Sequence, residues 1–395
     1  MISRGEYADR QQRFAAALRG AGLDGALVVS RGGATADRYG DVLYLSGHYQ
    51  HYSYLPDAPG LFSARAHTAV AISARGDAVL CVSVPEFDRT RLAVDDIRHG
   101  PRFVETVAQA LADLGLAGRT LALVGADVLP ANQWQALRLI APEITWREED
   151  ELLAKLRRVK SATEQALVRE AARIHRQATT RLIERLRPGV TEAEAMAAFV
   201  AEATSAGAGI YFTTMSSGEA TAMWASTPQP GFSRRALATG DLVRFDTGIV
   251  VAGYLSDFGR AVTIGPPGEG QRHLLQTLHG GLDAAIAAVR PGASVRAVVA
   301  AGEAALADAG VRPAGQAGDG IASSFPVHWG HGLGLGWERP WMTEAEELTI
   351  VPGMVLAIER ALTLPGVGTA AAEQNLLVGT DGVALLTAGP DGRWS

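Results

Sequence analysis

The feature that most constrains the fold is a change of pattern near residue 160. Before it, short apolar runs rich in β-branched residues alternate with helical segments, which is typical of an α/β domain. After it, two helical segments followed by strand-like runs occur twice, which predicts an α+β domain with a curved, mostly antiparallel sheet. We therefore predict two domains, residues 1–155 and residues 156–395, and the repeated order suggests an internal duplication.

Two capping boxes begin the second section. Ser161-Ala162-Thr163-Glu164 and Thr191-Glu192-Ala193-Glu194 each have the Ser/Thr-x-x-Glu form, in which each side chain satisfies the other residue's free backbone N–H. The first box begins a long alanine-rich helix, which Pro188-Gly189 ends. Other helices are predicted at 7–20 (ended by a left-handed Gly20), 103–114, 131–139, 271–289 and 295–309. Strands are predicted at 25–29, 42–45, 68–72, 78–84 and 120–124, and the charged run 147–151 is expected on a solvated surface.

Charge and cysteine content exclude several classes of protein. The 36 Lys and Arg against 42 Asp and Glu give a net charge of -6, which argues against nucleic acid or an anionic membrane as a partner. The single cysteine, Cys81, lies in an apolar run and is expected to be a buried structural thiol. No signal-peptide pattern and no apolar run of transmembrane length is present, so we expect a cytoplasmic protein.

Two aspartates follow neighbouring apolar runs. Asp246 and Asp257 are separated by a turn through Gly253, and we expect each of them at the end of a strand, facing the other. Two buried like charges raise one another's pKa, so such a pair needs a cation between its members. The alternative is a pair of aspartates in surface turns.

Three further side chains extend this set. His331 projects from a segment with glycine at alternate positions, Glu359 is expected at the end of an apolar strand, and Glu373 leads into another one. Taken singly, His331 could be a core residue, Glu359 an ion-pair partner of Arg360 or another arginine, and Glu373 a charge at a strand edge. A phosphate-binding glycine loop is disfavoured, because no helix N-terminus follows. Together, two Asp, one His and two Glu suit a pair of divalent metal ions bridged by carboxylates.

These five residues, in this order and with their surrounding sequence, resemble the metal ligands of the pita-bread family that includes prolidase, aminopeptidase P, methionine aminopeptidase and creatinase. The resemblance lies in FDTG…GYLSDFGR, GHGLGLG, PGMVLAIE and AAEQNLLV, and LRRVKSATE resembles the join between the two domains. It spans essentially the whole chain. It implies a creatinase-type N-terminal domain, a pita-bread catalytic domain, and Asp246, Asp257, His331, Glu359 and Glu373 as metal ligands.

Several positions depart from the family pattern. The proline-directed peptidases carry a histidine where Trp224 stands and another where Trp337 and Glu338 stand, which argues against ordinary Xaa-Pro cleavage. Their arginine two residues before the last ligand is Ala371 here. His328 is the nearest candidate for a helper in catalysis. We expect Trp224, Trp337 and Glu338 to contact the substrate, together with His51, whose aromatic loop resembles one that dimerisation brings near the site in creatinase-like relatives.

The sequence therefore predicts a dinuclear metal-dependent hydrolase that cleaves a C–N bond in a dipeptide-like or other small substrate, and that forms a homodimer. Glu359 or Glu373 is expected to pass a proton to the leaving nitrogen. Manganese is the first choice of metal, with cobalt, iron or zinc as alternatives, because the ligands are mainly carboxylates. Two alternatives stay open: a metal-dependent lyase acting on a small sulfonium-type substrate, and a catalytically silent binding module.

Overall fold

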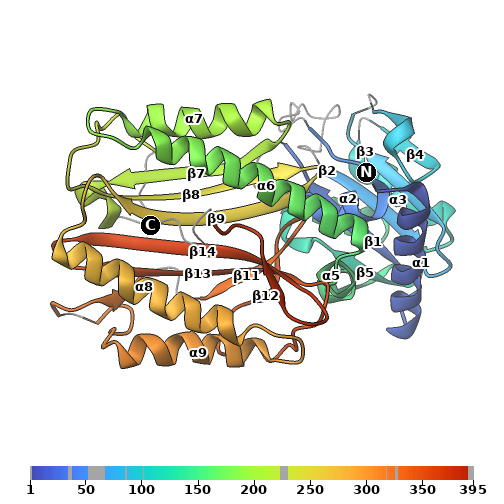
Figure 1. Cartoon of the computed structure of the whole chain (residues 1–395). Coiled ribbons are helices and arrows are strands. Elements are labelled where there is room, and N and C mark those ends of the chain that lie inside the picture. Colours follow the sequence, from blue (N-terminus) through green and yellow to red (C-terminus); the bar gives the residue numbers. More distant parts are fainter. Residues whose placement is uncertain are drawn as a thin grey trace. The chain divides into compact units, whose positions relative to one another are not determined.

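The computed structural model describes residues 2–33, 38–51, 67–84, 87–100, 102–222, 230–316, 318–324 and 328–389. The chain divides into two compact units, Met1–Arg157 and Arg158–Ser395, which we describe separately. Figure 1 shows both as layered arrangements of helices and strands.

The first unit is built on a six-stranded mixed sheet with the strand order β4-β3-β2-β1-β5-β6. The central strand β1 pairs antiparallel with β2 and parallel with β5, and buried side chains of β1, α3 and α4 form the core on one face. Cys81 is fully buried there, and burial raises the pKa of its thiol to about 12, so the predicted structural role is confirmed. The α/β prediction is also confirmed. The elements are α1 Arg4–Gly20, β1 Gly25–Arg31, α2 Gly40–Ser46, β2 His67–Ser73, β3 Ala78–Val82, β4 Asp96–His99, α3 Phe103–Asp113, β5 Thr120–Val124, α4 Ala131–Ile140, β6 Thr145–Glu148 and α5 Asp150–Arg158.

Two local predictions were wrong. The apolar run 42–45 belongs to helix α2 and not to a strand, because the Val42 N–H bonds to the Ser30 hydroxyl and Gly47 ends the helix in the left-handed region. Gly20 is the last helical residue of α1, and Gly22 takes the left-handed conformation instead. The charged run 147–151 lies at the surface as predicted, with three of its five residues exposed, and β6 ends within it while α5 begins within it.

The second unit contains two antiparallel sheets between two pairs of helices. Helices α6 and α7 cover the sheet β7-β8-β9, and α8 and α9 cover the sheet β12-β11-β13-β14-β15, with β9 and β14 side by side (Figure 1). All pairings between its named strands are antiparallel within the described residues, which confirms the predicted sheet. Both capping boxes form as predicted. The elements are α6 Ala162–Arg185, α7 Glu192–Ser205, β7 Gly209–Ser217, β8 Leu242–Val251, β9 Tyr254–Thr263, α8 Glu269–Ala288, α9 Val295–Asp308, β10 Ala322–Ser323, β11 Gly330–Gly334, β12 Gly336–Trp341, β13 Val355–Leu364, β14 Gly368–Val378 and β15 Val383–Leu385.

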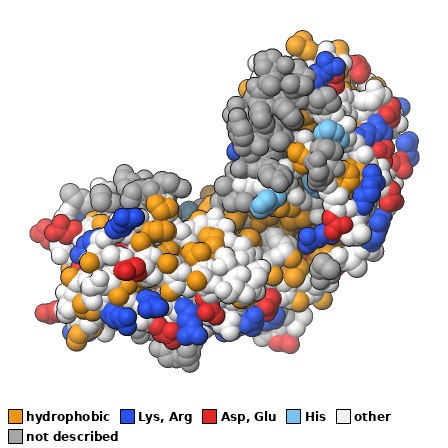
Figure 2. Space-filling view, turned by 90° about the horizontal axis from the view of Figure 1, so that it is seen from above, with side chains coloured by type: hydrophobic (Ala, Val, Ile, Leu, Met, Phe, Trp, Pro, Cys, Tyr) orange, Lys and Arg blue, Asp and Glu red, His pale blue; other side chains and the backbone are white. Residues whose placement is uncertain are grey.

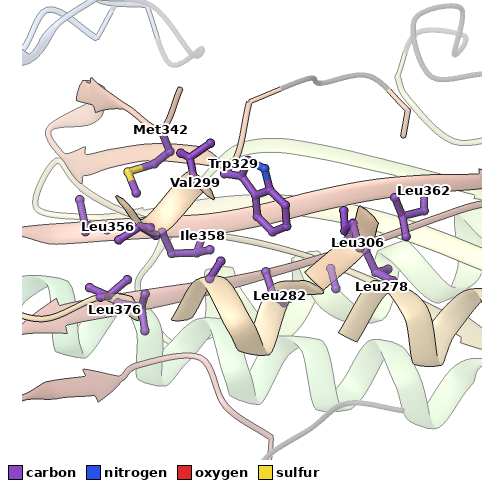
Figure 3. Packing of buried hydrophobic residues seen from close by; sticks show 14 of the residues in the cluster. Leu278, Leu282, Val299, Leu306, Trp329, Met342, Leu356, Ile358, Leu362 and Leu376 are labelled. Atoms are coloured by element: carbon purple, nitrogen blue, oxygen red, sulfur yellow. The ribbon is translucent and has the colours of Figure 1, made fainter. Parts of the chain in front are cut away.

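Alternation along the strands of this unit decides which side chains face the helices. On β13, Leu356, Ile358 and Leu362 pack with Leu278 and Leu306 of the helix pair (Figure 3). Because successive strand residues point to opposite faces, Glu359 lies on the other face of the sheet. The same period applies to β14, whose even-numbered apolar residues join this core.

The surface gives two further observations. On the face shown in Figure 2, acidic and basic side chains are interspersed among the described residues, so this face presents no continuous basic patch. Within the described residues, no helix combines the length and the apolar character that crossing a membrane requires.

Candidate metal centre

The hairpin of β8 and β9 brings the two predicted aspartates together. In its register Asp246 lies opposite Gly259 and Asp257 lies opposite Gly248, so the two carboxylates are diagonal neighbours on one face. The turn at Ala252 and Gly253 has positive φ at both residues, as a two-residue hairpin turn requires. Both aspartates therefore lie in the middle of their strands, and the prediction that they end the strands was wrong.

The two glutamates lie opposite each other on neighbouring strands of the second sheet. Glu359 of β13 is the direct antiparallel partner of Glu373 of β14. Both lie in the interior of their strands and not at the ends. Like charges at directly opposed positions destabilise a sheet unless a proton or a cation compensates them. Glu359 does not form the alternative ion pair with Arg360, because Arg360 pairs with Glu303 at 2.8 Å. Glu373 is not a charge at a strand edge, because it is buried and β14 has a neighbouring strand on each side.

His331 joins this group from the adjacent strand β11. Its Nδ1 lies 3.1 Å from the Gly332 carbonyl oxygen, and its Nε2 lies 3.7 Å from Asp257 Oδ2 and 3.9 Å from Glu359 Oε1. Burial lowers the pKa of His331 to about 4, so the imidazole is neutral near pH 7. If Nδ1 donates to the carbonyl, the lone pair of Nε2 points toward the carboxylates, as in a metal ligand.

The glycines around His331 allow close strand packing. A Cβ at Gly330 would lie 2.0 Å from the Ala357 carbonyl oxygen, and one at Gly332 would lie 2.6 Å from the Arg339 carbonyl oxygen. Both contacts are with backbone, which has little freedom to shift. The alternate glycines therefore serve strand-to-strand approach, as their pattern indicated.

The electrostatics of this cluster call for a positive charge. Burial raises the pKa of Asp246 to about 6, and burial together with the charge of Asp246 raises that of Glu359 to about 8. The pKa values of Asp257 and Glu373 lie well above their usual range, first through burial and then through the neighbouring carboxylates. Each carboxylate is disfavoured as an anion because it is buried, and for Asp257, Glu359 and Glu373 also because other carboxylates are close.

Unsatisfied oxygens supply a direct test of whether these residues fit a metal. Among the described residues, Asp246 Oδ1, Asp257 Oδ1 and Glu373 Oε1 are buried and have no hydrogen-bond partner. Leaving buried oxygens unpaired is costly, and native structures satisfy most such atoms. Asp257, His331 and Glu373 also each present one ligand atom within 4.8 Å of the others. Orphaned oxygens beside a neutral imidazole suit a divalent cation.

The other predicted site residues have different environments. His328 Nδ1 accepts the Gly330 N–H and lies 3.5 Å from Glu359 Oε1. Trp337 donates its indole N–H to Asp257 Oδ2 at 2.5 Å. Glu338 forms a buried ion pair with Lys160.

The structure does not test two of the predicted site residues. His51 is exposed and belongs to the first unit, and Trp224 lies outside the described residues.

Sequence reasoning missed a polar network behind the cluster. Asn375 accepts the Asp257 N–H and the Ser256 hydroxyl, both at 3.0 Å, and donates its own amide N–H to the Asp257 carbonyl. His175 of α6 lies 3.0 Å from the Ser256 hydroxyl and 2.8 Å from the Thr247 hydroxyl. Local sequence carried no signal for these residues, because their partners are 72 to 119 positions away.

Comparison with known proteins agrees with this architecture. The model of metallopeptidase family M24 matches residues 166–380, and that of the creatinase/prolidase N-terminal domain matches residues 10–159. The chain is 34% identical over 236 residues to the probable dipeptidase PepE of Mycobacterium bovis, and the match covers 59% of this chain and 59% of that relative, less than two thirds of its length.

Solved structures extend the similarity over nearly the whole chain. Dipeptidase PepE from Mycobacterium ulcerans has a TM-score of 0.77 at 27% identity, with 98% of this chain and 97% of that chain covered. The prolidase from Pyrococcus horikoshii OT3 has a TM-score of 0.78 at 21% identity, with coverages of 96% and 98%, and shows the shared fold. Because the family match spans more than half of the 395 residues, the chain belongs to metallopeptidase family M24.

Proposed function

We propose that the chain is a dinuclear metal-dependent dipeptidase, with Asp246, Asp257, His331, Glu359 and Glu373 as the metal ligands. The observation that carries the proposal is the carboxylate cluster, in which Asp246 Oδ1, Asp257 Oδ1 and Glu373 Oε1 are buried and have no hydrogen-bond partner within the described residues. The M24 family supports divalent metal ions, and the similarity to proteins named as dipeptidases supports a dipeptide-like substrate.

The ligand set favours manganese. Four carboxylates and one imidazole form a hard, oxygen-rich site, which suits Mn²⁺ and also admits Co²⁺, Fe²⁺ or Zn²⁺. When bound, a pair of such ions polarises a carbonyl group and lowers the pKa of a water molecule into the neutral range.

The chain's own groups provide the proton transfer. We propose that the Glu359 carboxylate takes up a proton during the reaction and passes it to the leaving amine. His328 lies beside this carboxyl group, with Nδ1 3.5 Å from Glu359 Oε1, but Nδ1 accepts the Gly330 N–H, so we assign His328 a positioning role. His331 stays neutral and serves as a ligand.

Aromatic side chains beside the cluster support an apolar substrate side chain. The Trp337 ring packs against Tyr211 and Phe212, with centroids 5.4 and 5.6 Å apart, and Trp341 packs against His331 at 5.6 Å. Trp337 and Trp341 are 40% and 41% exposed, so both offer free indole surface. We propose that a dipeptide with a large apolar or aromatic side chain packs there.

A panel of substrates tests the function. Chelator-stripped protein is reloaded with Mn²⁺, Co²⁺ or Zn²⁺ and incubated with apolar, charged and Xaa-Pro dipeptides, small cyclic amides and sulfonium compounds, with products identified by mass spectrometry. We expect hydrolysis of apolar dipeptides, lost in Asp246→Asn and kept in Asp308→Asn, an exposed carboxylate at the end of α9. Full activity of stripped protein contradicts the proposal, and elimination from a sulfonium compound would favour the lyase alternative. Light scattering tests the predicted homodimer.

A further inference from the structure

Trp337 makes an unusual contact for a side chain at the surface. The residue is 40% exposed, yet its indole Nε1–H donates to Oδ2 of the buried Asp257 at 2.5 Å. The two residues are 80 positions apart and lie on strands of different sheets. The bond therefore ties the orientation of the Asp257 carboxylate to the position of strand β12.

This hydrogen bond is the one that holds the side-chain carboxylate of Asp257 in place. Among the described residues, Trp337 is the only hydrogen-bond donor to the side chain of Asp257, whereas Asn375 holds the N–H and carbonyl of the same residue. Oδ1 has no partner there, and Oδ2 also lies 3.7 Å from His331 Nε2. One carboxylate oxygen is therefore held by the indole, and the other is left for a cation.

The indole is itself held in place. In the pairing of β11 with β12, Trp337 lies opposite Leu333, and its ring packs against Tyr211 and Phe212. The next residue, Glu338, forms the buried ion pair with Lys160. Gly334 leaves room for that carboxylate, since a Cβ there would lie 2.6 Å from Glu338 Oε1. These contacts restrict the movement of β12 at Trp337 and at the residue that follows it.

We propose that Trp337 is a positioning residue of the metal centre, which orients the Asp257 carboxylate toward the bound cation through its indole N–H. The proposal rests on the proposed function. Partners that orient ligands raise metal affinity, and removing one typically costs 10- to 100-fold. Trp337 thus has a role toward the metal in addition to any contact with substrate.

The test compares two tryptophans on the same strand. Trp337→Phe keeps an aromatic ring and removes the N–H. Trp341→Phe is the matched control, because Trp341 is 41% exposed and packs against His331, but no described hydrogen bond joins it to the cluster. Circular dichroism and thermal melts of the stripped proteins verify folding. The dissociation constant for Mn²⁺ is measured by calorimetry, and we expect it to rise 10- to 100-fold in W337F and to stay within twofold in W341F.

A measurement on the unsubstituted protein complements the variants. Its indole ¹⁵N–¹H resonances are assigned with W337F and W341F, and Zn²⁺ is then added. We expect the Trp337 resonance to shift and the Trp341 resonance to shift less, because only the former N–H bonds to a proposed ligand.

The outcomes separate the two proposals. Unchanged Mn²⁺ affinity in W337F, with an unshifted Trp337 resonance, overturns the role of Trp337 while leaving the dipeptidase intact. Absence of metal binding by the unsubstituted protein overturns both.

Discussion

Glu359 and Glu373 are direct partners across an antiparallel strand pair, and both carboxylates face away from the apolar core of their sheet. Two opposed, buried acids cost the folded protein stability unless a proton or a cation lies between them. This relationship connects the stability of the protein to the function of the site.

Neutralising one glutamate should stabilise the metal-free protein and inactivate the enzyme. In Glu359→Gln we expect the free energy of unfolding at pH 8.5, in the presence of chelator, to rise by about 1–3 kcal/mol, because like-charge repulsion and the burial of a charge are removed. Peptidase activity with metal should fall at least about 100-fold, since a group that carries a proton is lost. Urea denaturation and a peptide assay measure the two effects, with Asp308→Asn expected to change stability by less than about 0.5 kcal/mol. A destabilised E359Q protein would contradict this expectation.

Removing metal should make stability depend on pH in a defined direction. The folded-state pKa of Glu359 is about 8 against 4.5 for the free group, and that of Asp246 is about 6 against 3.8. At these two groups the folded state binds more protons than the unfolded state, so their contribution to the free energy of unfolding falls as pH rises from about 4 through about 8. Buried His331 has its pKa lowered from 6.5 to about 4 and contributes in the opposite direction below about pH 6.5, so we expect the fall in total stability between pH 7 and 8.5. Urea denaturation of chelated protein at pH 5, 7 and 8.5 measures this. Increasing stability between pH 7 and 8.5 would show that these groups are not the dominant ones.

Adding the metal back should restore the stability that is lost on chelation. A ligand at 100 times its dissociation constant stabilises the folded state by about 2.7 kcal/mol. For a domain of this size we expect the Tm to rise by about 5–10 °C on addition of Mn²⁺. Mg²⁺ at the same concentration serves as the comparison ion, and an identical shift with both ions would indicate nonspecific binding. Thermal melts followed by circular dichroism provide the measurement.

The network behind the cluster should matter for stability and metal binding together. Asn375→Ala leaves the Asp257 N–H, the Asp257 carbonyl and the Ser256 hydroxyl without their buried partner. We expect a loss of about 1–3 kcal/mol in the free energy of unfolding and weaker Mn²⁺ binding. Asn132→Ala, at an exposed position of α4, is the control and should be near neutral. Unchanged metal affinity in N375A would limit this network to a structural role.

Much of the site was predictable because its chemistry lies in local sequence. Asp246, Asp257, His331, Glu359 and Glu373 could be selected as acids or imidazole beside strand-like apolar runs, and their surrounding residues carry the family resemblance. The helix starts at Ser161 and Thr191 were predictable for the same reason, since a capping box involves only four consecutive residues.

Other features depend on which strands meet. The sequence by itself determined the residue types, their order and the alternation that separates Glu359 from the leucines of β13. Only the tertiary structure decided that the acids lie within strands, that Glu359 faces Glu373, that Arg360 turns to Glu303, and that Trp337 bonds to Asp257. The physical reason is that strand register and sheet-to-sheet packing join residues 14 to 119 positions apart, and no local pattern carries that information.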